Sequence, residues 1–226
     1  MKKISIILLL FLSSFSAKAH LEHYKNFKKI EMEILRNGKV IGYSHYFFTR
    51  NKDETTVTNQ VKFTIKLMGA TIFNVDGYGE EKYLNNELIS YESKTLQNDK
   101  QKFVKLNLDK KKNRFYIKGS SYVGDAGVDN IIGNWWNHKI LQTDSQISPI
   151  SGSVKKQVVT FVGKEKIEQY GKVYNVDRFT LKSKDMTLPK DKRLDFNIWY
   201  DQENFQIIRV SYSRMGNWEY RLKSFE

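Results

Sequence analysis

The stretch Leu194-Asp195-Phe196-Asn197-Ile198-Trp199-Tyr200 places an apolar residue at every second position. Leu194, Phe196, Ile198 and Tyr200 would share one face of an extended chain, because successive side chains of a strand point to opposite sides. Alternation of this kind is typical of a half-buried β-strand. The stretch therefore predicts a strand with one face toward a core and the other toward solvent.

The same alternation recurs along the rest of the chain. Ile30, Met32 and Ile34 alternate with charged residues, and they are followed by Asn37-Gly38, the strongest short signal for a β-hairpin. Further strands are predicted over residues 40–49, 57–67, 71–84, 88–97, 103–109, 114–118, 158–167, 172–183, 205–214 and 218–225. We therefore expect an all-β fold, in which a single antiparallel sheet curves into a half-barrel or barrel.

One segment, residues 122–153, interrupts this series of strands. Its apolar residues follow the spacing of one helix face, and they are Val128, Ile131, Ile132, Trp135 and Trp136. We predict a short helix between Val128 and Leu141, lying against the concave side of the sheet. Gly133 in its interior would weaken this helix by about 1 kcal/mol relative to alanine.

The first 19 residues have the features of a secretory signal peptide. Lys2 and Lys3 precede an apolar run, and Ala17-Lys18-Ala19 supplies the small residues that signal peptidase requires. We expect residues 1–19 to be removed and residues 20–226 to form a single exported domain with a helical insertion near 122–153. The chain has no cysteine, which suits a bacterial periplasm better than a harsher extracellular setting.

The chain is strongly basic, with a formal net charge of +13. Because the lysines are spread over the whole sequence, one interpretation is a surface that keeps the protein soluble. The functional alternative is contact with an anionic membrane surface, for which Lys110-Lys111-Lys112 in a predicted turn is a candidate. Export argues against nucleic acid as a partner, and the sequence does not indicate an oligomeric state.

No catalytic site is predicted. The sequence has no cysteine, no Gly-x-Ser-x-Gly motif and no glycine-rich phosphate loop. Glu80 and Glu81 are adjacent on a predicted strand and must point to opposite faces, so they do not form the carboxylate pair of a glycosidase. Each is interpreted as a solvated acid. We therefore expect a protein that is not an enzyme and that uses no cofactor.

A metal site is not predicted either. The histidines of the chain are His20, His23, His45 and His138. Cleavage after Ala19 would make His20 the N-terminal residue, whose amine and imidazole could chelate copper only with a further histidine nearby in space. His138, next to two tryptophans, is interpreted as a surface histidine at a helix end rather than as a ligand.

The many aromatic residues on predicted strands allow two interpretations. They have more bulk than a tight two-layer core needs, which suits a cavity for an acyl chain or another apolar ligand. Phenylalanine and tyrosine also simply favour strands. If a cavity exists, we predict that it is lined by Trp135, Trp136, Phe63, Ile65, Phe196 and Ile198. Trp135 and Trp136 would then fill its mouth or close its base.

Several motifs occur in an order that resembles an uncharacterised family of exported proteobacterial proteins. These motifs are Asn37 to Gly42, Val75 to Glu81 leading into Glu87 to Thr95, Trp135-Trp136, and Ile198 to Asp201. The resemblance covers roughly residues 27–222. It implies a sheet that curls like the periplasmic lipoprotein carriers, a half-barrel wrapped around a helix. The family is a domain of unknown function, so the resemblance implies no activity, cofactor or catalytic residue.

The function that these features favour is non-enzymatic. We expect a periplasmic binding or carrier protein for an apolar or amphipathic ligand such as a lipid. The alternative is a structural or protein-interaction module of the cell envelope, with a filled core and no ligand. A transmembrane barrel ranks third, because the predicted strands carry charges on both faces.

Overall fold

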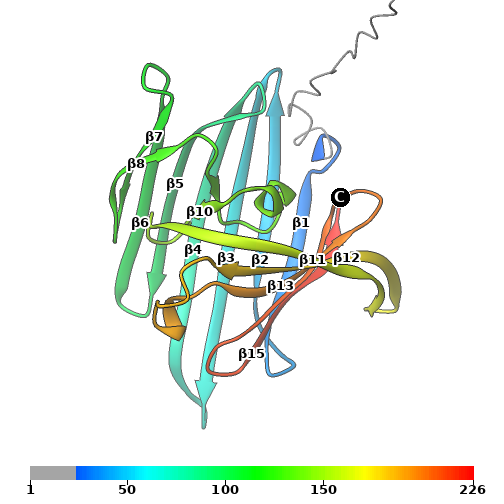
Figure 1. Cartoon of the computed structure of the whole chain (residues 1–226). Coiled ribbons are helices and arrows are strands. Elements are labelled where there is room, and N and C mark those ends of the chain that lie inside the picture. Colours follow the sequence, from blue (N-terminus) through cyan, green and yellow to red (C-terminus); the bar gives the residue numbers. More distant parts are fainter. Residues whose placement is uncertain (1–23) are drawn as a thin grey trace, which may run out of the picture.

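The computed structural model describes residues 24–226, and almost all of its regular structure is β-strand (Figure 1). The predicted signal peptide, together with His20 and His23, lies outside the described residues. The first eight strands are β1 (Lys29–Arg36), β2 (Lys39–Asn51), β3 (Glu54–Leu67), β4 (Ala70–Leu84), β5 (Glu87–Gln97), β6 (Lys100–Asp109), β7 (Arg114–Gly119) and β8 (Val123–Gly127). The others are β9 (Ile131–Ile132), β10 (Ser145–Ile147), β11 (Val154–Gln169), β12 (Lys172–Ser183), β13 (Asp195–Asp201), β14 (Ile207–Ser213) and β15 (Asn217–Phe225). Two short 3-10 helices are η2 (His138–Gln142) and η3 (Lys190–Lys192).

All the strands belong to one sheet. Its order is β8-β7-β6-β5-β4-β3-β2-β1-β15-β14-β13-β12-β11-β10-β9, so the two terminal strands β1 and β15 pair at its centre. Every pairing is antiparallel except that between β9 and β10. The prediction of an all-β, largely antiparallel sheet is confirmed, and its hairpin at Asn37-Gly38 has the positive φ angles, 49° and 77°, that a tight hairpin turn requires.

The sheet curls back toward itself without closing. Its two end strands, β8 and β9, follow each other in the sequence and are joined only by residues 128–130. Four Cα–Cα steps of about 3.8 Å connect Gly127 to Ile131, so the two ends lie within about 15 Å of each other. Bulges within the ladder, such as those at Ile34/Leu35 and Ile65/Lys66, add the local twist that strong curvature needs.

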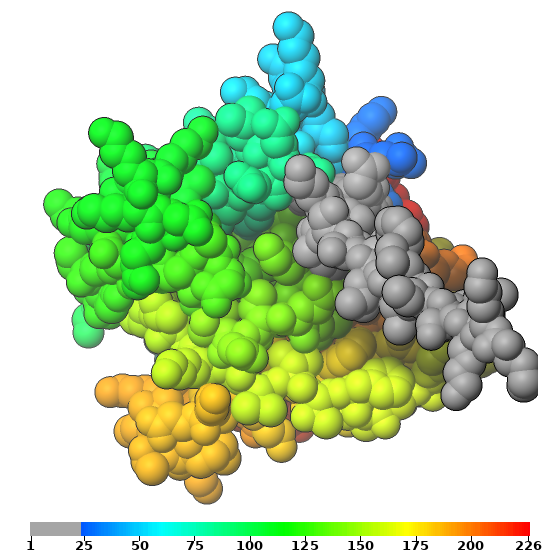
Figure 2. Space-filling view, turned by 45° about the horizontal axis from the view of Figure 1, so that its top comes forward, coloured from blue at the N-terminus to red at the C-terminus, as the bar shows by residue number. Residues whose placement is uncertain are grey.

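The predicted helix between Val128 and Leu141 is wrong in most of its extent. Ile131 and Ile132 form strand β9, and only His138–Gln142 is helical, as the 3-10 helix η2. Residues 122–153 therefore hold three short strands and one helical turn. Side chains on both sides of this segment are buried, which a regular helix with one apolar face would not allow. In Figure 2 the segment, coloured yellow-green, lies between the green and the yellow parts of the chain.

The core consists of three groups of buried side chains. The largest joins β1–β3 to β12–β15 around Trp136 and Ile140. A second lies under β5–β8 and includes Leu106 and Ile117. The third is small and contains Ile34, Ile65 and Trp218. A hollow region borders this third group, and it is the candidate site.

Candidate ligand-binding cavity

A cavity of about 630 Å³ lies between the strands β2–β5 and the strands β13–β15. This volume is within the range of roughly 300–1,000 Å³ that is usual for small-molecule sites. Its lining is mostly apolar and comes from both halves of the chain. The main apolar residues are Val61, Phe63, Ile65, Ile72, Phe73, Val75, Trp135, Ile150, Phe196, Tyr212, Met215, Trp218 and Tyr220.

Small side chains keep this space open. Ser44 on β2, Gly79 on β4, and Ser93 and Thr95 on β5 are wall residues that point inward and are themselves buried. Glycine at position 79 leaves room for the Tyr91 ring of β5, because a Cβ atom there would come within 2.8 Å of the Tyr91 hydroxyl oxygen. Because these positions are small, β2, β4 and β5 leave room where other strands fill the core.

Four of the six residues predicted to line a cavity are found in its wall. Trp135, Phe63, Ile65 and Phe196 line it, whereas Trp136 and Ile198 do not. Trp136 and Ile198 are fully buried in the main core. For the two tryptophans the difference arises because Trp136 turns toward β4 and Tyr24, while Trp135 turns toward β13.

Aromatic rings form a continuous wall along the C-terminal side of the cavity. The ring centroids of Trp135 and Phe196 are 4.9 Å apart, and those of Phe196 and Tyr212 are 5.2 Å apart. Tyr212 stacks on Trp218 at 5.7 Å, and Trp218 meets Phe63 of β3 edge-on at 5.4 Å. Edge-to-face and offset contacts at these distances stabilise the rings beyond simple burial. These contacts make this side of the cavity a continuous aromatic surface.

Trp135 is held in place through its backbone. The Tyr200 hydroxyl of β13 donates a hydrogen bond of 2.7 Å to the Trp135 carbonyl oxygen. The Trp135 amide in turn donates to the Tyr46 hydroxyl of β2 at 3.4 Å. Two strands from opposite halves of the sheet thus clamp the same residue. These contacts fix the backbone of Trp135, and its ring is placed in the wall by the contact with Phe196.

The buried carboxylate of Glu81 binds the residues on either side of Trp135 in the chain. The exposed fraction of Glu81 is only 2%, and its Oε1 atom accepts hydrogen bonds from Asn134 Nδ2 at 2.7 Å and from the Trp136 indole Nε1 at 2.9 Å. The Tyr83 hydroxyl donates to its other oxygen. Burial raises the pKa of the Glu81 carboxyl above its ordinary value, although the three hydrogen bonds lower it.

The interpretation of Glu81 as a solvated acid is therefore wrong. Glu80 and Glu81 do point to opposite faces of β4, as predicted, but the face of Glu81 is the inner one. Val75, Gly77, Gly79 and Tyr83 share that face and are buried as well. The alternation along β4 could have revealed this, because every second residue from Val75 to Tyr83 except Glu81 is uncharged.

His138 is also buried, contrary to its interpretation as a surface histidine. Its ring Nδ1 lies 2.7 Å from the Tyr24 hydroxyl oxygen, which also accepts a hydrogen bond from the His138 amide at 3.0 Å. The ring stacks on Phe205 with the centroids 4.9 Å apart. Burial raises the pKa of Tyr24 well above its usual range. The contacts between Tyr24 and His138 hold the start of η2 against the N-terminal end of the described residues.

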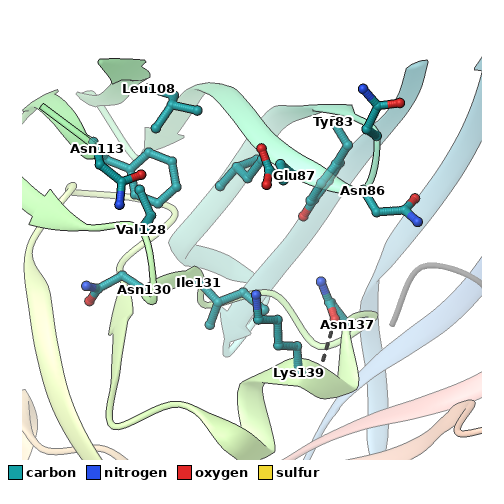
Figure 3. Close-up of a pocket in the computed structure, with 13 residues that line it drawn as sticks. Tyr83, Asn86, Glu87, Leu108, Asn113, Val128, Asn130, Ile131, Asn137 and Lys139 are labelled. Atoms are coloured by element: carbon teal, nitrogen blue, oxygen red, sulfur yellow. Dashed lines mark hydrogen bonds between the residues drawn. The ribbon is translucent and has the colours of Figure 1, made fainter. Parts of the chain in front are cut away.

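A second, smaller cavity of about 260 Å³ lies beside β4–β7 and the segment around β9 (Figure 3). Five asparagines line it, but each has a structural task or a turn position. Asn137 caps η2 by accepting from the Lys139 amide at 3.0 Å, and Asn130 accepts from Ser145 Oγ at 2.6 Å. Asn85, Asn86 and Asn113 occupy hairpin turns with positive φ. These asparagines are therefore explained by the fold without a ligand.

Within residues 24–226, no three side chains of the metal-ligating types His, Cys, Asp or Glu lie close enough together to hold an ion. Among the same residues, none of the helices has the length and hydrophobicity needed to cross a bilayer.

Comparison with known proteins places the chain in a family. None of the curated proteins matches the sequence. A beta-barrel-like protein of the domain of unknown function DUF1849 from Brucella abortus has a similar structure, with a TM-score of 0.59 and 10% sequence identity over 88% of this chain and 96% of that one. At this identity the likeness concerns the fold alone. The family model described as domain of unknown function DUF6134 matches residues 32–223. The chain therefore belongs to the DUF6134 family.

Proposed function

We propose that this protein is a non-enzymatic periplasmic binding or carrier protein for an apolar or amphipathic ligand. The observation that carries the proposal is the cavity of about 630 Å³, whose mostly apolar wall comes from both halves of the sheet. A structural module with a filled core would have side chains in this space. The predicted signal peptide and the lack of cysteine support the periplasmic location.

The cavity also contains a cation that suits an acidic head group. Arg36 lines it, and the Arg36 Nε atom is buried without a hydrogen-bond partner in residues 24–226. The same guanidinium donates to the Met215 carbonyl oxygen and lies 6.0 Å from the centroid of the Trp218 ring. A ligand carboxylate or phosphate in the cavity would pair with this guanidinium through a charge-assisted hydrogen bond. The favoured ligand is therefore an acyl chain with an acidic head.

The first experiment is native mass spectrometry on the chain expressed from its full sequence and purified without detergent. We expect an apolar molecule to copurify, or added palmitic acid to bind at one equivalent. Val61→Trp should abolish this binding, because Val61 lines the cavity. Lys62→Trp is the matched control, since the exposed Lys62 is adjacent on β3 and points to the other side.

The outcomes distinguish the two candidate functions. Binding that is lost in Val61→Trp and kept in Lys62→Trp supports a carrier. A wild-type chain that neither copurifies with an apolar molecule nor binds palmitic acid contradicts it, and so does equal binding by the two variants. Circular dichroism of each variant checks that the sheet is intact.

A further inference from the structure

Apolar side chains are displayed on turns at one end of the curled sheet. Met68 in the β3–β4 turn is 100% exposed, and Met215 in the β14–β15 turn is 90% exposed. Leu67 and Ile72 beside Met68 are also exposed. We call Leu67, Met68, Ile72 and Met215 the tip patch. In Figure 1 both turns lie at the lower end of the molecule, with the β3–β4 turn projecting farthest.

The tip patch borders the mouth of the cavity. Ile72 and Met215 line the cavity and are exposed to solvent at the same time. They come from opposite halves of the sheet, so the mouth lies between the two turns. A molecule that entered the cavity here would pass directly between these apolar side chains.

The hairpins themselves do not favour methionine at these positions. Met68 and Met215 have φ angles of 50° and 48°, in the left-handed region, and each is followed by a glycine. Asparagine tolerates this conformation better than most residues, and Asn37 and Asn98 occupy comparable turn positions in other hairpins of this sheet. Two residues that are strained and fully exposed contribute little to folding, which points to a role in binding.

Exposed aromatic residues in turns at the opposite end, unlike these methionines, make contacts within the fold. Tyr170 also has a positive φ, but its hydroxyl donates to Glu33 Oε2 at 2.7 Å. Phe205 stacks on the buried His138 ring. These residues have packing or hydrogen-bonding tasks within the fold. A fully exposed Met68 side chain has no packing task of this kind.

Basic residues flank the tip patch. Lys39, Lys66 and Arg214 are exposed and lie next to the turns at this end. None of the three forms an ion pair with an acidic group in the described part of the chain. Exposed apolar side chains beside cations that have no acidic partner among the described residues match the interface of a bilayer that contains anionic lipids.

We propose that this end of the protein docks on an anionic lipid bilayer, with the tip patch inserted at the boundary between head groups and acyl chains. The mouth of the cavity then faces the lipid, so that an amphipathic molecule can move between bilayer and cavity without crossing water. Lys110–Lys112, the basic cluster noted in the sequence, lies in the β6–β7 turn at the opposite end (Figure 1). Docking itself does not require a bound ligand, whereas the movement of a molecule between bilayer and cavity rests on the proposed carrier function.

The test is flotation of the chain, expressed from its full sequence, with vesicles of phosphatidylglycerol and phosphatidylcholine in equal amounts. Met68→Asn/Met215→Asn should weaken partitioning by about tenfold or more, because two methionine side chains lose their apolar burial. Asparagine suits the backbone of both turns, so this variant should unfold no earlier than the wild type. Val123→Thr/Val173→Thr removes similarly exposed apolar groups elsewhere and should partition normally.

A charge variant and an oxidation measurement complete the test. Replacing Lys110, Lys111 and Lys112 by glutamine lowers the net charge but should weaken binding less than the double methionine change. Anionic vesicles should also slow the peroxide oxidation of Met68 and Met215 in the wild type, whereas phosphatidylcholine vesicles should not. Absence of wild-type binding, equal binding to phosphatidylcholine alone, or unchanged binding by Met68→Asn/Met215→Asn would each overturn the proposal.

Discussion

Replacing Glu81 with leucine would leave three buried hydrogen-bond donors without their acceptor. These are Asn134 Nδ2, the Trp136 indole N–H and the Tyr83 hydroxyl. Each unsatisfied donor costs about 1–3 kcal/mol. Burial of the leucine side chain offsets about 1.5–3 kcal/mol of this loss. We therefore expect Glu81→Leu to lower the free energy of unfolding by roughly 2–6 kcal/mol, a large share of the stability of an ordinary domain.

Glutamine at the same position should behave differently. Its amide oxygen can accept from Asn134 and Trp136, and the Tyr83 hydroxyl can turn to accept from its amide nitrogen. Glu81→Gln also removes the pH dependence of the buried acid. The folded protein holds the Glu81 proton more tightly than the unfolded chain does, because its pKa is raised from the ordinary 4.5. The wild type therefore loses stability as the pH rises from 4.5 through the raised pKa.

Urea unfolding followed by tryptophan fluorescence, at several pH values between about 4 and 8, measures both effects. The stability of Glu81→Gln relative to the wild type should increase as the pH rises through this window. Glu80→Gln is the matched control, because Glu80 lies next to Glu81 but on the outer face. A Glu81→Leu variant within about 1 kcal/mol of the wild type would refute the reasoning. A Glu81→Gln variant as damaged as Glu81→Leu would also refute it.

Two further predictions concern the cavity and its neighbours. Trp136→Ala should lower the free energy of unfolding by about 3–5 kcal/mol, because it empties a fully buried site. Trp135→Ala, at the cavity wall, should lower it by about 1 kcal/mol. Equal losses of stability in urea unfolding would contradict the different positions of the two rings. Arg36→Leu should weaken the binding of palmitic acid by about tenfold while the binding of hexadecanol changes little, since only the acid accepts a charge-assisted hydrogen bond. Calorimetric titration of both ligands measures this. An equal effect on both ligands would exclude Arg36 as the residue that binds the acidic head group.

The strands were predictable because their signals are local. Period-two alternation and turn chemistry depend only on neighbouring residues, and they located the strand at Lys172–Ser183 and the turn at Asn37-Gly38 correctly. The structure of residues 128–141 was not predictable in the same way. Its apolar residues match a helical spacing, but here the two ends of a curled sheet meet, and tertiary contacts override the local preference.

The candidate site shows the same division between local and tertiary information. The sequence alone determined that this protein is built from alternating strands, that it is basic and free of cysteine, and that aromatic residues are concentrated on its strands. Only the tertiary structure decided that Trp135 lines a cavity while Trp136 is sealed in the core, and that Glu81 is buried. The physical reason is that both outcomes depend on the curl of the sheet, which brings β3 beside β13–β15 although more than a hundred residues separate them in the chain. No local pattern encodes which neighbour such a distant strand will supply.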